Sequence, residues 1–175
     1  MATPAADLKR WIADVPDFPK PGILFRDITP LLRNGPQLRR VIDRLSRRYA
    51  RRRIDVVVGV EARGFLLAAA VADRLHAGLV PVRKRGKLPR QTARVAYQLE
   101  YGTDALEIHA DAIHPGDRVL IIDDVLATGG TMHAVTTLVR RLGGRIVELA
   151  FLIELTALRG RARLHSHPMH ALIRY

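Results

Sequence analysis

The sequence predicts an α/β fold in which a central, mostly parallel sheet is flanked by helices. Runs of β-branched and aliphatic residues at 54–60, 119–122 and 146–153 are typical of buried strands. Helical patterns alternate with these runs, which favours βαβ units. The composition, 48% hydrophobic and 26% charged over 175 residues, is that of one folded domain. We therefore expect a single domain over residues 1–175, with an N-terminal arm or hood at about 1–33.

The N-terminal region begins with a predicted short helix at residues 4–13, whose Leu8, Trp11 and Ile12 share one face. The next segment, Pro16–Gly22, contains three prolines, each of which lacks a donor and has a fixed φ. It is therefore predicted to be an ordered arm or loop that leads into residues 23–28.

The middle of the chain starts with a predicted amphipathic helix over 36–52, with its arginines largely on the outer face. Its apolar residues at helical spacing are Leu38, Val41, Ile42, Leu45 and Tyr49. After the strand at 54–60, a helix over 65–76 is expected to close at Gly78, before a short strand at 79–82.

Residues 84–94 are polar, basic and without a period, so they predict a mobile loop. Residues 96–101 and 105–109 alternate apolar with polar side chains around Gly102, which is typical of a hairpin. The remaining predicted elements are a strand at 119–122, a helix at 129–142, a strand at 146–153 and an edge strand at 171–174.

Composition excludes several classes of site. Without cysteine, the chain can form no disulfide, thiolate zinc site, iron–sulfur cluster or cysteine nucleophile, which suits a reducing cytoplasm. The longest apolar run, 64–72, is far shorter than the ~20 residues of a membrane helix. Asp7, Lys9 and Arg10 make the N-terminus unlike a signal peptide. We expect a cytoplasmic location and no membrane partner.

The net charge of +12 comes from 29 basic and 17 acidic residues, and 25 of the basic residues are arginine. A positive field favours anionic partners such as nucleic acid, phosphorylated metabolites or acidic surfaces. Charge alone does not choose among them, and coding bias also produces an excess of arginine over lysine.

The strongest motif is the segment Val119–Thr131, in which a buried strand is followed by Asp123 and Asp124 and then by a turn that opens a helix. Small residues and a helix N-terminus form a cradle for phosphate, and Thr128 and Thr131 add hydroxyl donors. A larger side chain at Gly129 is therefore expected to obstruct the phosphate.

The paired carboxylates would repel phosphate, so they are expected to face sugar hydroxyls and a hydrated divalent cation. The plainer alternative is that Asp123 and Asp124 form a turn and that residues 128–131 only cap a helix. The glycine-rich motifs of nucleoside triphosphate hydrolases and dinucleotide-binding folds do not occur in the sequence.

The segment Val119–Thr131 resembles the phosphoribosyl-pyrophosphate motif of the type I phosphoribosyltransferases. Three further segments are similar to those of the family members that act on adenine: Phe18–Ile28, Glu61–Phe65, and Arg83–Pro89 followed by Leu99–Gly102. The resemblance, from about residue 18 to 161, implies the type I phosphoribosyltransferase fold with a small hood and a flexible loop or hairpin. It implies transfer of the 5-phosphoribosyl group from phosphoribosyl pyrophosphate to adenine, giving AMP and pyrophosphate. It also implies Mg²⁺ held mainly through substrate and water, and a homodimer.

The resemblance also assigns roles to residues. Asp123 and Asp124 match the ribose-contacting acids, and Glu100 matches the group that handles the proton at purine N7. The cradle for the 5-phosphate is Ala127, Thr128, Gly129, Gly130 and Thr131. The pyrophosphate contacts are Glu61, Ala62, Arg63, Gly64, Arg83, Lys84 and Lys87, in a region where the family often has a non-proline cis peptide and can act across the dimer interface. The adenine contacts are Leu24, Phe25, Arg26 and Leu155.

Two other functions stay open at this point. One is the same reaction on hypoxanthine, guanine or xanthine. The other is a non-catalytic regulator that senses phosphoribosyl pyrophosphate and binds nucleic acid through residues 33–53, where nine arginines accompany a single acid, Asp43. That stretch lacks interleaved aromatic residues, and its apolar stripe is typical of an amphipathic surface helix, so no nucleic-acid partner is expected.

Two features depart from the resemblance. Arg90 stands where the family commonly has glycine. The tail carries His165, His167 and His170, which suggests metal, but their spacing around Pro168 fits neither helical nor strand ligation.

Overall fold

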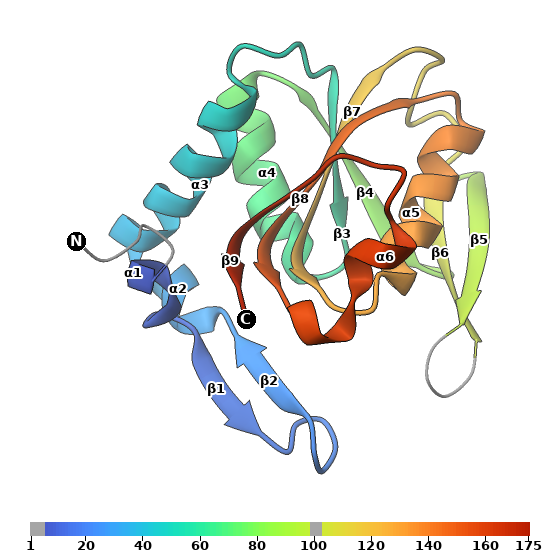
Figure 1. Ribbon diagram of the computed structural model, residues 1–175. Coiled ribbons are helices and arrows are strands. Elements are labelled where there is room, and N and C mark those ends of the chain that lie inside the picture. The colour runs from blue at the N-terminus through green and yellow to red at the C-terminus, as the bar shows by residue number, and fades with distance from the viewer. Residues whose placement is uncertain (1–5, 99–102) are drawn as a thin grey trace.

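A seven-stranded sheet forms the centre of the computed structural model, which describes residues 6–98 and 103–175 (Figure 1). The strand order is β5-β6-β4-β3-β7-β8-β9. The five parallel strands are β3 (Val56–Val60), β4 (Gly78–Lys84), β7 (Arg118–Leu126), β8 (Arg145–Glu154) and β9 (Met169–Arg174). The hairpin of β5 (Thr92–Gln98) and β6 (Thr103–His109) continues the sheet antiparallel beyond β4. The predicted α/β class is confirmed.

Helices cover both faces of the sheet (Figure 1). On one side lie α3 (Gly35–Tyr49) and α4 (Arg63–Leu75), and on the other lies α5 (Gly130–Arg141). Because successive side chains of a strand point to opposite faces, β7 supplies both cores. Leu120 and Ile122 pack with the α3–α4 side, whereas Val119 and Ile121 pack with the α5 side, and all four are fully buried.

The N-terminal region forms a separate two-stranded hairpin, β1 (Ala13–Pro16) with β2 (Leu24–Asp27), which projects from the body in Figure 1. It is flanked by the short helices α1 (Ala6–Lys9) and α2 (Thr29–Arg33). Arg26 on β2 ion-pairs with Asp14 on β1, and its guanidinium carbon lies 3.9 Å from the ring centroid of Tyr175. The end of the chain therefore anchors the base of the hairpin.

Two short elements follow β8: the 3₁₀ turn η1 (Thr156–Leu158) and α6 (Gly160–Arg163). The sequence did not predict them, nor β1 and α2. The expected helix at 4–13 ends at Lys9, because the chain then extends to pair with β2 over four residues. Such short elements depend on a partner from elsewhere in the chain and carry little pattern of their own.

Several element boundaries also differ from those expected. The helix expected to close at Gly78 ends at His76, which adopts the left-handed conformation with φ +53, while Gly78 already begins β4. The loop expected at 84–94 is shorter, because Lys84 belongs to β4 and residues 92–94 pair with β6. The strand expected at 119–122 continues to Leu126, so the two aspartates lie within β7 because β8 pairs with it beyond Ile122.

A buried ion pair ties α3 to the sheet. Glu148 on β8 is 2% exposed and accepts two hydrogen bonds from Arg48, each 2.7 Å long. Burial alone would raise the pKa of the Glu148 carboxyl, but the hydrogen bonds and charge of Arg48 hold it below the ordinary value.

We expect Arg48→Met to lower the free energy of unfolding by about 2–3 kcal/mol at pH 7, because it leaves a buried carboxylate without its main partner. The loss is moderated by Arg52, which is 3.9 Å from Glu148. A lowered folded-state pKa stabilises the protein above the unfolded pKa and ceases to do so as pH falls. The difference from wild type should therefore shrink as pH falls below about 4 and disappear once Glu148 is protonated in the folded protein.

Urea denaturation at several pH values measures this difference. Arg47→Met is the matched control, since it changes the same residue type on the same helix without touching Glu148. Equal losses in both variants, or a loss that persists at low pH, would contradict the assignment.

Candidate active site

The candidate site lies between β3 and β7, where the order in which strands are added to the sheet reverses. From β3 the chain moves to β4 on one side, whereas from β7 it moves to β8 on the other. The β3–β7 pairing ends at Gly59 and Ile122. Beyond this point the two strands separate, because β3 ends at Val60 whereas β7 continues beside β8 to Leu126. Such a switch point at the carboxyl ends of parallel strands opens a crevice in which ligands bind.

Asp123 and Asp124 emerge on the β7 side of this crevice. Asp124 is 5% exposed, and its backbone N–H donates to Asp123 Oδ1 at 2.8 Å. Gly64 comes so close from the β3 side that a Cβ there would lie 2.8 Å from Asp123 Oδ1. The motif at 61–64 and the acid pair, far apart in the sequence, are therefore in direct contact, and only glycine fits between them.

Arg63 connects three parts of the site. Its Nε lies 2.7 Å from Asp124 Oδ2, and its guanidinium carbon lies 4.7 Å from the ring centroid of Phe25 in the hood hairpin. The ion pair lacks the alignment of a hydrogen bond, so Asp124 Oδ2 has no hydrogen-bond partner among the described residues. This buried carboxylate oxygen is therefore balanced by the charge of Arg63 and not by a hydrogen bond.

Both acids have raised pKa values. Burial is the main cause at Asp123, and the neighbouring Asp124 carboxylate raises that pKa further. Burial also raises the pKa of Asp124, but the Arg63 charge opposes the shift there. Asp123 therefore takes up a proton before Asp124 as pH falls. Two carboxyl groups with raised pKa values in a crevice are typical of a functional site and suit hydroxyl or cation ligands.

The predicted phosphate cradle forms the turn between β7 and α5. Residues 127–129 follow the strand, and α5 begins at Gly130 after Gly129 turns with φ +82. The turn encloses a cavity of about 70 Å³, lined also by Asp123 and Thr131. The free N–H groups at a helix start suit an anion. All five expected cradle residues line this one cavity.

The sequence analysis did not predict that Gly160 packs directly behind the cradle. A Cβ on Gly129 would lie 2.8 Å from the carbonyl oxygen of Gly160, and one on Gly160 would lie 2.3 Å from that of Ala127. The expectation that a side chain at Gly129 obstructs only the phosphate is therefore incomplete, because it first meets the backbone of α6. Nothing in the local pattern around Gly160 signals this contact, which joins segments 31 residues apart only after folding.

Glu61 gathers the basic residues expected at the pyrophosphate site. Its carboxylate accepts from the Lys84 backbone N–H at 3.0 Å, forms an ion pair with Lys87, and lies 3.4 Å from Arg83 Nε. Burial would raise the pKa of Glu61, but these partners outweigh it and lower the value. The Glu61–Ala62 peptide is cis, as expected from the resemblance, and Ala62 is the N-cap of α4.

The expected adenine contacts lie on two sides. Leu24, Phe25 and Arg26 are on β2, where Leu24 is 45% exposed and the Phe25 ring packs edge-on against Phe18 with centroids 5.1 Å apart. Leu155 follows β8 and packs against the core on the α3–α4 side. The hood thus leaves apolar side chains free for a planar ligand.

Three further features singled out in the sequence are Glu100, the tail histidines and Arg90. Glu100 lies outside the described residues. Within 6–98 and 103–175, no group of three or more His, Asp or Glu side chains is placed to hold a metal ion, so the tail histidines form no such cluster. Arg90 forms an ion pair with Asp111.

Arginines of the 33–53 stretch are partly neutralised within the protein: Arg40 pairs with Asp7 and Arg48 with Glu148. In the described part of the chain, no helix has both the length and the hydropathy needed to cross a bilayer.

The chain matches the family model for the phosphoribosyl transferase domain over residues 31–168. It is 56% identical over 169 residues to the adenine phosphoribosyltransferase of Chloroflexus aurantiacus, covering 97% of this chain and 98% of that protein. The corresponding protein of Thermotoga maritima is 57% identical, with coverage of 97% and 98%.

Solved structures agree. Adenine phosphoribosyltransferase from Rhodothermus marinus superposes with a TM-score of 0.95 at 55% identity, covering all of both chains. The enzyme from Saccharomyces cerevisiae, in complex with adenine and an imino-altritol bisphosphate, gives a TM-score of 0.92 at 40% identity, covering 98% of this chain and 99% of that chain.

The contact between Gly129 and Gly160 leads to a testable difference between glycines. Gly129→Ala should destabilise the protein by at least about 1 kcal/mol more than Gly116→Ala and should weaken phosphate binding. Both glycines have positive φ, but a Cβ at Gly116 meets nothing within 4 Å. Thermal unfolding of the two variants, with and without phosphate, measures the difference. Equal destabilisation would show that the approach of α6 imposes no constraint.

Proposed function

The chain belongs to the phosphoribosyl transferase family, among the adenine phosphoribosyltransferases, and on that premise we propose how its own residues carry the reaction. It transfers the 5-phosphoribosyl group from phosphoribosyl pyrophosphate to adenine, giving AMP and pyrophosphate. The observation that carries the proposal is the meeting of the acid pair, the loop at 61–64 and the phosphate cradle at one switch point.

The cradle at 127–131 holds the 5-phosphate through main-chain N–H groups and the hydroxyls of Thr128 and Thr131. The ribose then extends toward Asp123, which lines the same cavity. As the bond from the anomeric carbon to pyrophosphate breaks and the bond to adenine forms, positive charge builds on the ribose ring. Asp123 and Asp124 accept hydrogen bonds from the sugar hydroxyls and stabilise this charge from a largely buried position.

The leaving pyrophosphate lies over the loop at 61–64. Arg63 and the backbone N–H groups at the start of α4 supply positive charge there, and Arg83, Lys84 and Lys87 approach from the β4 side. Glu61, being itself anionic, acts by orienting these three residues rather than by contacting a phosphate oxygen directly. Pyrophosphate competes with Glu61 for Lys87 when it binds.

Carboxylate oxygens at Asp123 and Asp124 suit a hard divalent cation, and Asp124 Oδ2 is buried without a hydrogen bond. Because the described residues offer no larger cluster of ligands, Mg²⁺ would be shared with substrate oxygens and water. When bound, it would neutralise charge on the pyrophosphate.

Adenine lies between Leu24 of the hood and Leu155, with the main chain at Phe25 and Arg26 reading its edge. Glu100, which lies between β5 and β6 in the sequence, handles the proton at purine N7. In this proposal the chain is a single domain with residues 1–33 as the hood, it acts as a homodimer in the cytoplasm, and the basic turn after β4 can reach across the dimer.

Base selectivity is tested by supplying phosphoribosyl pyrophosphate and Mg²⁺ with each purine in parallel. Adenine should be converted to AMP, whereas hypoxanthine and guanine should react at least about a hundredfold more slowly. A site whose polar groups pair with adenine leaves those groups unpaired when a different base binds. Comparable rates with hypoxanthine would contradict the proposed adenine site.

The acid pair should limit stability while it supports activity. A folded-state pKa raised above the unfolded value, as at Asp123, makes the charged form destabilising once pH rises above about 4. Asp123→Asn should therefore raise the free energy of unfolding by about 1–2 kcal/mol at pH 7, with no gain below about pH 4. Turnover should fall by about a hundredfold.

Asp73→Asn is the matched control, because Asp73 is exposed on α4 and outside the site. It should change neither stability nor turnover. If Asp123→Asn kept wild-type turnover, or lowered stability at pH 7, the acid pair would have only a structural role at the end of β7.

A further inference from the structure

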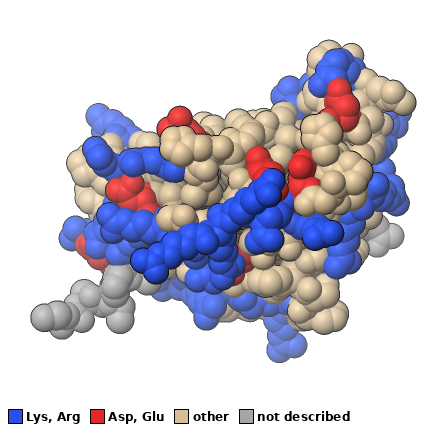
Figure 2. Space-filling view, turned by 90° about the horizontal axis from the view of Figure 1, so that it is seen from above, with Lys and Arg blue, Asp and Glu red and all other residues tan. Residues whose placement is uncertain are grey.

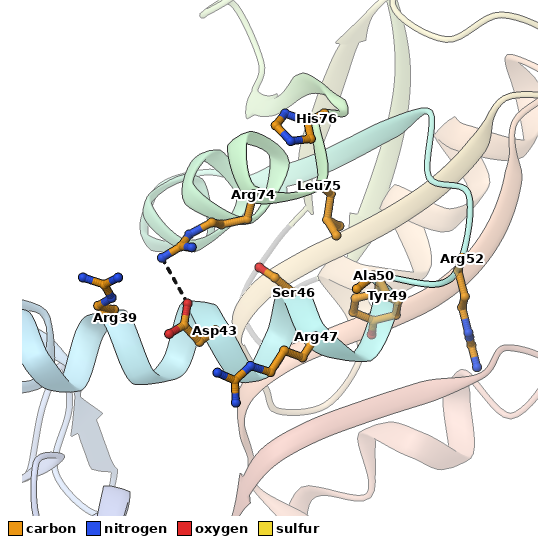
Figure 3. A pocket seen from close by; sticks show the side chains of 10 residues that line it. All are labelled: Arg39, Asp43, Ser46, Arg47, Tyr49, Ala50, Arg52, Arg74, Leu75 and His76. Carbon is orange, nitrogen blue, oxygen red and sulfur yellow. Dashed lines mark ion pairs between the residues drawn. The ribbon is translucent and has the colours of Figure 1, made fainter.

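A second groove, of about 480 Å³, lies between α3 and α4 at the opposite end of the molecule from the site above (Figure 3). It is lined by α3 from Arg39 onward, by Ala50 and Arg52 just after that helix, and by Arg74, Leu75 and His76 at the end of α4. These residues immediately precede β3 and β4, so the groove lies at the amino ends of the parallel strands. The 13 residues of α4 place it about 20 Å from Arg63.

The groove is strongly basic. Four arginines, Arg39, Arg47, Arg52 and Arg74, line it together with one carboxylate, Asp43. Arg74 ion-pairs with Asp43 at 3.1 Å, and Arg52 lies 3.9 Å from Glu148. Within residues 6–98 and 103–175, neither Arg39 nor Arg47 has an ion-pair partner. Figure 2 views the molecule from this end and shows Lys and Arg side chains prevailing over acidic ones.

The floor of the groove holds an unused polar group. Ser46 is 8% exposed, and its hydroxyl has no hydrogen-bond partner among the described residues. Figure 3 shows this hydroxyl directed from α3 into the space between the two helices. A buried hydroxyl is normally satisfied, so Ser46 has a hydrogen-bonding group that a ligand in the groove could use.

The lining also narrows the chemistry of the ligand. The ring of Tyr49 is fully buried, so His76 is the one aromatic side chain of the lining that could stack on a nucleobase. Guanidinium groups instead match the oxygens of phosphate, which they bind in pairs of hydrogen bonds. A volume of about 480 Å³ is in the range of sites for small molecules.

We propose that the α3–α4 groove binds the polyphosphate group of a small phosphorylated metabolite, at a site separate from the active site. Arg39 and Arg47 clamp the phosphates, Arg74 contributes from α4, and Ser46 donates its hydroxyl at the floor. The ligand is recognised mainly through its phosphates.

Inorganic triphosphate is the probe, and amide NMR spectra locate its binding because they separate the groove from the cradle. Amides at 39–52 and 74–76 should shift and saturate on titration, independently of those at 127–131. Arg39→Gln with Arg47→Gln should weaken the groove response by about tenfold or more. Ser46→Ala should weaken it by about threefold with an unchanged melting temperature.

Arg51→Gln with Arg145→Gln is the matched control, since it removes the same charge from exposed positions outside the groove. It should alter binding by less than about twofold. AMP formation should stay within about twofold of wild type in both double variants, which separates this proposal from the assignment of the active site.

Three results would overturn the proposal. One is the absence of shifts at 39–52 and 74–76 up to about 10 mM triphosphate, while residues 127–131 respond. Another is an equal loss of binding in both double variants, which would indicate a general field of charge. The third is displacement of triphosphate by a short RNA duplex whose affinity falls equally in both variants, which would indicate a nucleic-acid surface.

Discussion

The ion pair between Arg63 and Asp124 is the interaction on which the architecture of the active site depends. Two adjacent carboxylates are placed in a largely buried position, which is unfavourable unless a positive charge lies close to them. Arg63 supplies that charge from the first turn of α4 and at the same time lies over the Phe25 ring of the hood hairpin. One side chain thus relates the acids of β7, the loop after β3 and the hood to one another. In the proposed reaction, substrate hydroxyls and a cation would offset the remaining electrostatic cost by contacting the carboxylate oxygens.

Close backbone approaches make this arrangement rigid. Gly64 lets the loop after β3 pack against Asp123, and the contact between Gly129 and Gly160 packs α6 against the cradle. At both places a methyl group would meet an oxygen atom at 2.8 Å. Because a site must hold its groups within fractions of an ångström, such contacts serve function more than stability. The raised pKa values of Asp123 and Asp124 likewise mean that keeping both carboxylates charged in the folded protein lowers its stability, in return for two carboxylates placed at the site.

The arginine side chains serve two different purposes in this structure. Some guanidinium groups are consumed in structural pairs, as in the pair of Arg48 with Glu148, and these tie α3 to the sheet. Others, such as Arg39 and Arg47, remain available in the α3–α4 groove at the amino ends of the strands. Helix α4 runs between the candidate active site and the groove, with Arg63 at the first and Arg74 at the second. Part of the large net charge therefore lies at two places where anions can be bound.

The sequence by itself determined the alternation of strands and helices, the buried strands of the sheet and the cradle motif at 119–131. These depend on the periodicity of apolar residues and on turn chemistry within a few neighbouring positions, which a linear pattern records. The tertiary structure alone decided that β1 pairs with β2, that the left-handed His76 ends α4, and that Gly160 backs the cradle. It also decided that Glu61 gathers the basic turn and that Arg63 reaches both Asp124 and Phe25. Each of these outcomes depends on which distant segment lies next to a residue after the sheet has formed, and that proximity leaves no local signal in the chain.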